Sequence, residues 1–136
     1  ELPLYGQVKL LRVIEDNLVQ PVGSNKRRKV DIRVISATNR NLKKMISNKS
    51  FREDLYYRIH VLPIYIPPLR QRAIDIPIIT EKIMKTHFNG KSISYSGIKK
   101  LTNHHWPGNV RELFATLQRA AILTKEDKIE QSDIFF

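Results

Sequence analysis

The sequence contains no cysteine, which excludes a disulfide-stabilised scaffold and any chemistry that requires a thiol. Its five glycines are scattered over 136 residues, so no glycine-rich phosphate-binding loop is present. No apolar run approaches the roughly 20 residues of a membrane-spanning helix, and the first residues lack the pattern of a signal peptide. These absences predict a protein of a reducing cytoplasm that has no membrane partner.

Acidic residues are also scarce, since 13 Asp and Glu stand against 24 Lys and Arg, for a net charge of +11. The excess predicts an anionic partner without saying which kind. Residues 1–72 carry a net charge of +9 and residues 73–136 a net charge of only +2. This asymmetry, together with the helix-breaking pair Pro67 and Pro68, predicts two small units that meet near residue 70.

Apolar periodicity predicts one helix over residues 5–18 and two short helices over residues 41–48 and 52–59. Residues 30–35 and 62–66 have the pattern of two strands in a covered sheet. Residues 19–29 between the first helix and the first strand form a turn with a basic run, compatible with a short hairpin. The first unit is therefore predicted to be α/β.

The second unit is predicted to be all-helical. Asp75 can cap a helix that has Pro77 in its first turn and ends near Phe88, and Ser96 can cap a second helix. The clearest helix starts near Asn109, where Asn109 and Glu112 have the spacing of a capping box.

Three polar groups are candidates for a ligand site, each with a simpler interpretation. Arg111, at the second position of the last helix, either is a solvated side chain or forms an anion site with the helix N-terminus. Arg52 and Arg58 point about 120° apart on a helix, so they can share a ligand only if Arg52 lies at the helix mouth. Alternatively, Asp54 and Arg58 form an ordinary surface ion pair. Thr38 and the adjacent amide, Asn39, lie at a strand end, where α/β sheets bind ligands, or in a turn that caps the next helix.

The run of four bases at residues 26–29 can contact a phosphate backbone, although a solvated loop is the simpler interpretation because no aromatic residue is interleaved. The four histidines lack metal-ligand spacing, so no metal site is predicted. No Ser-His-Asp or Cys-His arrangement is present either.

Several motifs occur in order along the chain: ELPL at 1–4 with QVKLLRV at 7–13, VG at 22–23, DIRVISATNR at 31–40, FREDLYYR at 51–58, PPLRQR at 67–72 with DIP at 75–77, and WPGNVREL at 106–113. Together they closely resemble the central AAA+ ATPase module of bacterial sigma-54-dependent transcriptional activators, the enhancer-binding proteins. The resemblance covers residues 1 to about 134. It implies an α/β fold with the second half of a P-loop NTPase sheet, without the Walker A strand, over residues 1–70, and a helical lid over residues 71–136.

The resemblance also assigns roles to the candidate residues. Thr38 and Asn39 match sensor I, which senses the γ-phosphate of ATP. Arg52 and Arg58 match the arginine fingers, which act in trans on the ATP of a neighbouring subunit, and Arg111 matches sensor II on the lid. The implied function is ATP-driven remodelling of sigma-54 RNA polymerase to open promoters, by a homo-oligomeric ring in the bacterial cytoplasm.

Several parts of the family module do not match any residues of this chain. In the family, the Walker A loop, the Walker B acids and the sigma-contacting loop precede Glu1, which therefore is not the catalytic glutamate, and the DNA-binding helix-turn-helix follows the module. We expect ATP and Mg²⁺ to bind the full-length module and neither to bind this chain tightly, so the chain alone should not hydrolyse ATP. The unpaired strands should expose apolar surface at Val34, Ile35, Ile64 and Ile66.

Two other functions remain open. Residues 96–124 read as helix, turn, helix, and with the charge of +11 they suggest a nucleic-acid-binding module. Against this, Arg111, Gln118 and Arg119 do not share one helix face, and most bases lie elsewhere. The third possibility is a purely structural or oligomerisation segment.

Overall fold

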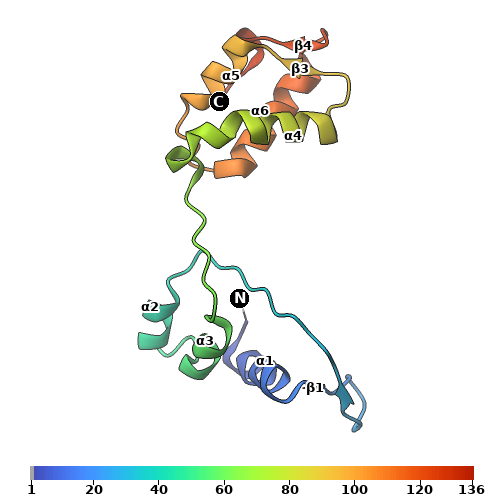
Figure 1. Ribbon diagram of the computed structural model, residues 1–136, viewed down its shortest axis with the longest axis vertical. Helices are drawn as coiled ribbons and strands as arrows, with labels where there is room; N and C mark the ends of the chain where they lie inside the picture. Colours follow the sequence, from blue (N-terminus) through green and yellow to red (C-terminus); the bar gives the residue numbers. More distant parts are fainter. Residues whose placement is uncertain (1) are drawn as a thin grey trace. The chain divides into compact units, whose positions relative to one another are not determined.

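The computed structural model describes residues 2–136, so Glu1 of the first motif lies outside it. The chain forms two compact units, one up to Ile64 and the other from Tyr65 to Phe136 (Figure 1). Each unit is described by itself. None of the helices in residues 2–136 is both long and apolar enough to cross a bilayer.

The first unit is built on three helices: α1 (Leu4–Asp16), α2 (Leu42–Ser47) and α3 (Glu53–Ile59). Helices α1 and α3 pack side by side (Figure 1). Their contact buries Leu11 of α1 against the α3 side, where Leu55 and Tyr56 are also buried. All three helices confirm the sequence prediction to within two residues.

A hairpin follows α1 directly. Asn17 takes a left-handed conformation with φ of 54° and ends the helix, and its backbone N–H donates to the Val13 carbonyl. Strand β1 (Leu18–Val19) then pairs antiparallel with β2 (Arg28–Lys29). The short hairpin suggested by the sequence is therefore present.

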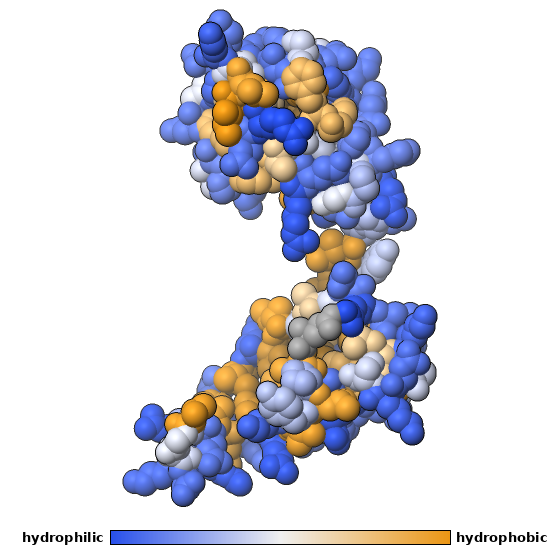
Figure 2. Space-filling view, turned by 180° about the vertical axis from the view of Figure 1, so that it is seen from behind, coloured by the Kyte–Doolittle hydropathy of each residue, from blue (hydrophilic) through white to orange (hydrophobic). Residues whose placement is uncertain are grey.

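The two predicted covered strands do not form. Residues 31–35 and 62–66 belong to no strand, because no neighbouring strand lies beside either segment within residues 2–136. Val30 only extends the β1–β2 pair, since its N–H donates to the Asn17 carbonyl at 2.8 Å. Their apolar side chains are exposed instead, as Ile35 at 85% and Ile64 at 80% illustrate. The expected exposure of Val34, Ile35, Ile64 and Ile66 is thus confirmed, and hydrophobic patches are visible on the surface (Figure 2).

The second unit packs three helices around one core: α4 (Ile76–His87), α5 (Tyr95–Thr102) and α6 (Asn109–Leu123). The large hydrophobic side chains with no exposed surface are Leu69, Ile76, Leu101, Trp106, Leu113, Leu117, Ile129 and Ile134. The 3-10 turns η1 (Leu69–Gln71) and η2 (Ala73–Asp75) lead into α4, and η3 (Gln131–Asp133) follows α6.

The second unit is not entirely helical. Strand β3 (Ser92–Ile93) pairs in parallel with β4 (Lys128–Ile129). This pair forms because the Ser94 backbone N–H donates to the Ile129 carbonyl at 3.0 Å. It joins the start of α5 to the segment after α6, a long-range contact that local periodicity does not reveal.

The helix caps differ from two of the predictions. Helix α4 starts after Asp75 and contains Pro77 in its first turn as predicted, although Asp75 makes no side-chain cap hydrogen bond. Helix α5 is capped by Ser94, whose hydroxyl accepts from the Gly97 N–H at 3.1 Å, so the prediction of Ser96 is wrong. The N-cap of α6 is Gly108 rather than Asn109.

Candidate functional site

The predicted site residues fall into two groups. Thr38, Asn39, Arg52 and Arg58 belong to the first unit, and Arg111 belongs to the second. Each group is described within its own unit.

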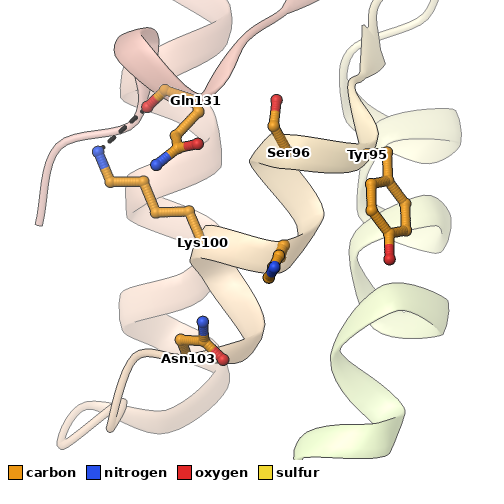
Figure 3. Close-up of a pocket in the computed structure, with 6 residues that line it drawn as sticks. Tyr95, Ser96, Lys100, Asn103 and Gln131 are labelled. Atoms are coloured by element: carbon orange, nitrogen blue, oxygen red, sulfur yellow. Dashed lines mark hydrogen bonds between the residues drawn. The ribbon is translucent and has the colours of Figure 1, made fainter.

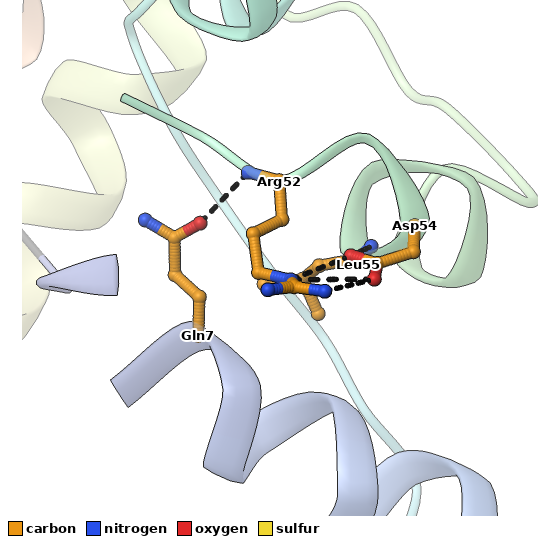
Figure 4. Close-up of polar contacts among 4 residues, drawn as sticks. All are labelled: Gln7, Arg52, Asp54 and Leu55. Atoms are coloured by element: carbon orange, nitrogen blue, oxygen red, sulfur yellow. Dashed lines mark hydrogen bonds and ion pairs between the residues drawn. The ribbon is translucent and has the colours of Figure 1, made fainter. Parts of the chain in front are cut away.

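Arg52 lies at the N-terminus of α3, as its N-cap residue, with an extended backbone (φ −77°, ψ 135°). Its backbone N–H donates to Gln7 Oε1 at 2.9 Å (Figure 4). The amide nitrogen of Gln7 in turn donates to the carbonyls of Leu2 at 3.0 Å and Ser50 at 3.1 Å. Gln7 is 1% exposed, so a buried amide on α1 fixes the backbone position of Arg52.

The Arg52 guanidinium binds Asp54 in the first turn of α3 (Figure 4). Nε donates to Oδ1 at 3.0 Å and Nη2 donates to Oδ2 at 2.6 Å, which is a bidentate arrangement. These hydrogen bonds lower the pKa of Asp54 below its usual value and raise the pKa of Arg52. The predicted pairing of Asp54 with Arg58 is therefore wrong, because the N-cap geometry brings Arg52 back over the first turn.

Arg58 lies in the last turn of the same helix, where a cation is favoured by the helix dipole. Its Nη2 lies 3.4 Å from the carbonyl oxygen of Ile14 on α1, which is a weak hydrogen bond. Arg52 lies at the N-terminus of α3, which is the position required for the two arginines to share a ligand. In this structure the two guanidinium groups nevertheless bind different partners: Arg52 binds Asp54, and Arg58 binds the carbonyl of Ile14.

Thr38 and Asn39 lie in an exposed segment just before α2. The Thr38 hydroxyl accepts from the Arg40 backbone N–H at 3.0 Å, which forms a local turn. The residue that caps α2 is Asn41, whose Oδ1 accepts from the Lys44 N–H at 3.0 Å. Neither Thr38 nor Asn39 caps the helix, and the strand whose end they were predicted to occupy is not formed.

Arg111 is the third residue of α6 rather than the second, because the helix starts at Asn109. Its side chain is exposed and makes no hydrogen bond or ion pair with any other residue of the described chain. Its cation stands in the first turn, where the helix dipole favours an anion. This arrangement is suited to receiving a negatively charged group from outside the unit.

The turn before α6 is fixed at three points. Trp106 is fully buried, and its Nε1 donates to the Leu101 carbonyl at 2.8 Å. Glu112 Oε2 accepts from the Gly108 N–H at 2.7 Å. The predicted capping box of Asn109 and Glu112 is not formed, because the N-cap is Gly108 and Glu112 is the fourth residue of the helix. The Asn109 side chain serves elsewhere, since its Oδ1 accepts from the Leu69 N–H at 2.7 Å. These contacts hold the turn ahead of Arg111 in place.

One hollow of the second unit, of about 430 Å³, is lined by Tyr95, Ser96, Lys99, Lys100, Asn103 and Gln131 (Figure 3). Lys100 Nζ donates to the carbonyls of Gln131 at 3.1 Å and Ile134 at 2.7 Å, so its charge is occupied in holding the C-terminal segment. None of the five predicted site residues lines this hollow.

No group of three or more His, Asp or Glu side chains within residues 2–136 is arranged to hold a metal ion. The positive groups Arg52, Arg58 and Arg111 can bind phosphate oxygens.

The sequence prediction missed Gln7. A signal was present, because Leu4, Gln7 and Leu11 share one helical face and a glutamine among leucines on such a face is an anomaly. Its partners, the backbone groups of Ser50 and Arg52, lie more than 40 residues away and could not be foreseen.

Two family models match consecutive parts of the chain. Residues 1–65 match the Sigma-54 interaction domain, and residues 70–135 match the AAA+ ATPase lid domain. The chain belongs to the sigma-54-dependent activator family. It corresponds to the C-terminal portion of the AAA+ module, which confirms the predicted family and fold class.

Curated members of the sigma-54 activator family agree with this assignment. The transcriptional regulatory protein FlgR of Helicobacter pylori is 45% identical over 140 residues, covering 99% of this chain and 37% of FlgR. The formate hydrogenlyase transcriptional activator FhlA of Escherichia coli is 45% identical over 137 residues, covering 97% of this chain and 20% of FhlA. The chain thus spans well under half the length of these relatives.

Solved structures of the family have the same fold. NtrX from Brucella abortus in complex with ATP has a TM-score of 0.81 and 37% identity, over 98% of this chain and 32% of the NtrX chain. NtrX in complex with ADP has a TM-score of 0.79 at the same identity and coverage.

Proposed function

We propose that this chain is the C-terminal part of the ATP-hydrolysing, sigma-54-interacting module of a bacterial transcriptional activator. In this proposal the complete protein remodels sigma-54 RNA polymerase so that promoters open. The observation that carries it is the order of the two family matches, which together leave only five residues uncovered. The NtrX relatives bound to ATP and ADP support the nucleotide assignment.

The residue roles in this proposal come from the match between the motifs of this chain and those of the family. Arg52 and Arg58 act in trans as arginine fingers, which stabilise the charge that develops on the transferred phosphoryl group. Arg111 acts from the lid as sensor II, and its unpaired cation fits that role. Thr38 and Asn39 act as sensor I. The α/β part ends near residue 70, where the lid begins.

The rest of the proposal concerns the complete protein. It assembles as a homo-oligomeric ring in the bacterial cytoplasm, binds ATP with Mg²⁺, and reaches DNA through a separate domain. Acidic Mg²⁺ ligands and a phosphate-binding loop would have to come from outside residues 2–136. The alternative of a helix-turn-helix module at residues 96–124 has no comparable support, because the lid family accounts for these residues.

The decisive experiment measures ATP turnover by a full-length protein that contains this chain. Arg52→Ala and Arg58→Ala should each lower kcat by about 10³-fold or more, the range observed for arginine fingers. Arg12→Ala, an exposed arginine on α1, removes the same charge and should leave kcat unchanged.

Two further results would decide the proposal. Mixing full-length Arg58→Ala subunits with full-length subunits whose phosphate-binding loop is inactivated should restore part of the turnover that each variant lacks alone, because an intact finger of one subunit then serves the intact nucleotide site of its neighbour. The 136-residue chain alone should show no turnover. Measurable hydrolysis by this chain, or normal kcat in both arginine variants, would contradict the proposal.

A further inference from the structure

Gln7 is a buried polar residue to which the proposed function gives no role. Among residues 2–64 it is the only polar residue whose side chain is buried, at 1% exposed, and it lies one turn before Leu11 on the buried face of α1. Burying an amide is unfavourable unless its hydrogen bonds are made, and an apolar side chain of similar size could fill the same space without that requirement. The partners of the amide therefore explain its presence.

Both donors of the Gln7 amide and its oxygen are in use. Nε2 donates to the carbonyls of Leu2 at 3.0 Å and Ser50 at 3.1 Å. Oε1 accepts from the Arg52 backbone N–H at 2.9 Å, which joins α1 to the start of α3 (Figure 4). Turning the amide over would set its NH2 group against the Arg52 N–H and its oxygen against two carbonyls, so only one orientation is satisfied. A buried polar group that is fully satisfied in this way fixes the relative positions of its partners.

The backbone at Arg52 depends on this contact. Arg52 is the N-cap residue of α3, and the N–H groups at the start of a helix have no acceptor inside the helix. The loop that leads to Arg52 is held from its other end, because the N–H groups of Ser50 and Phe51 donate to the Met45 carbonyl at 2.9 and 3.2 Å. The backbone from which the Arg52 side chain leaves is thus tied to α1 by Gln7 and to α2 by Met45.

Helix α1 also contacts the second arginine of the proposed pair. Arg58 Nη2 lies 3.4 Å from the Ile14 carbonyl of α1, and α1 packs beside α3. Gln7 and Ile14 are separated by about 10 Å along α1, and Arg52 and Arg58 by about 9 Å along α3. The two arginines are therefore set against one helix at nearly matching intervals.

We propose that Gln7 is a positioning residue for the reaction in trans. Through the Arg52 backbone it sets the point from which the Arg52 guanidinium reaches the nucleotide of a neighbouring subunit. This role of Gln7 depends on the proposed role of Arg52 as an arginine finger. Gln7 acts through Arg52 rather than on the nucleotide, and its effect is geometric, because a displacement of about 1 Å can lower a rate by about 10²-fold.

A purely structural role for Gln7 has different consequences. If Gln7 only stabilised the first unit, its loss would impair the whole subunit, including the nucleotide site that the subunit itself carries. If Gln7 positions Arg52, its loss impairs only what the subunit supplies to its neighbour. Kinetics and subunit mixing separate the two.

The first test measures ATP turnover by the full-length protein that contains this chain. Gln7→Met removes the amide and keeps a side chain of similar length. It should lower kcat by about 10- to 100-fold and leave KM within about threefold, since an arginine finger stabilises charge that develops in the transition state. Gln118→Met makes the same substitution at an exposed position of α6 and should leave both constants unchanged.

The second test mixes full-length variants. Gln7→Met subunits should recover turnover when mixed with subunits whose phosphate-binding loop is inactivated, because the intact fingers of the latter serve the intact nucleotide sites of the former. Mixed with Arg58→Ala subunits, they should show no turnover beyond their own, because neither subunit supplies an intact pair of fingers. A subunit damaged as a whole would recover in neither mixture.

Gln7→Asn provides a second variant, because it keeps the amide but shortens the side chain by one methylene group. If Gln7→Met loses its helical circular dichroism, Gln7→Asn enters the same mixtures with the same expected results.

Several outcomes would overturn the role of Gln7. These are an unchanged kcat in the Gln7 variant, recovery with Arg58→Ala subunits, or no recovery with the loop-inactivated subunits. Arg52→Ala subunits in the latter mixture are the reference. Their failure to recover would overturn the proposed function itself, whereas failure of the Gln7 variant alone would overturn only the role of Gln7.

Discussion

At the scale of single residues, the Arg52 side chain already has an anionic partner within its own helix, the carboxylate of Asp54. The guanidinium that we propose to act on a neighbouring nucleotide is bound, in this chain, by a carboxylate in the first turn of its own helix. Both side chains are about 40% exposed, so the contact is open to competition by phosphate oxygens. Arg52 can therefore exchange one anionic partner for another without leaving the helix mouth.

The pKa of Asp54 provides a test of this contact. Because the folded-state pKa is lowered, the contact stabilises the fold fully above the usual aspartate pKa of about 4 and is lost as the pH falls through the lowered value. An NMR titration should find the Asp54 midpoint below the usual aspartate value of about 4. Arg52→Gln should return the midpoint to the usual range, and equal midpoints in the two proteins would contradict the contact.

The position of a single residue could be predicted from the sequence where its contacts are with nearby residues, and could not where they are with distant ones. Arg111 was correctly placed in the first turn of a helix because its surroundings are local: a tryptophan turn before it and apolar residues at helical spacing after it. The partner of Arg52 was predicted wrongly, since the choice between i,i+2 and i,i+4 pairing depended on whether position 52 lies inside the helix. The role of Gln7 depends on two segments brought together only by folding.

At the scale of elements, the start of α6 is held by contacts that come from three parts of the second unit. Trp106 is anchored to the end of α5, Glu112 holds the Gly108 N–H, and Asn109 reaches back to Leu69 in η1. The hydrogen bond between Asn109 and Leu69 consequently ties the first turn of α6, which carries Arg111, to η1 near the start of the second unit.

Asn109→Ala should destabilise the second unit by about 1–3 kcal/mol. The change leaves the N–H of the fully buried Leu69 without its acceptor, and it places alanine at φ of 53°, where asparagine is better tolerated. The measurement is the free energy of unfolding in urea. Asn89→Ala, at an exposed position of the same unit, should change it by less than about 0.5 kcal/mol, and equal effects would contradict the assigned role.

The helices were predictable because their signal is a short-range repeat of apolar residues and their ends depend on nearby residues. The strands were not, because a strand exists only through its neighbours. Ile32 and Val34 alternate with charged residues as a strand would, yet no strand lies beside them in residues 2–136. The opposite case is the β3–β4 pair, which forms although the sequence does not predict it, because strands of two residues are too short to produce an alternating pattern.

At the scale of the whole molecule, two extended segments expose large apolar side chains to solvent. The exposed side chains of the segments at 30–35 and 61–66 include Ile35, Val61, Leu62, Ile64 and Ile66, each at least 70% exposed. Extended apolar segments with free backbone N–H and C=O groups readily pair with other chains.

We expect the 136-residue chain to self-associate as its concentration rises, with sedimentation velocity as the measurement. Ile35→Lys/Ile64→Lys should shift the distribution toward the monomer, because it puts charge on both extended segments. Ile74→Lys, at a residue that is 84% exposed in η2, adds charge elsewhere and should have little effect. A monomer at every concentration would show that the exposed segments do not drive association.

The burial of Trp106 has an optical consequence. It is the only tryptophan of the chain, it is fully buried, and it belongs to the second unit. Its fluorescence therefore reports on the core of that unit alone, whereas circular dichroism averages the helices of both. Comparing the two signals during denaturation would reveal directly whether the two units melt together or one after the other.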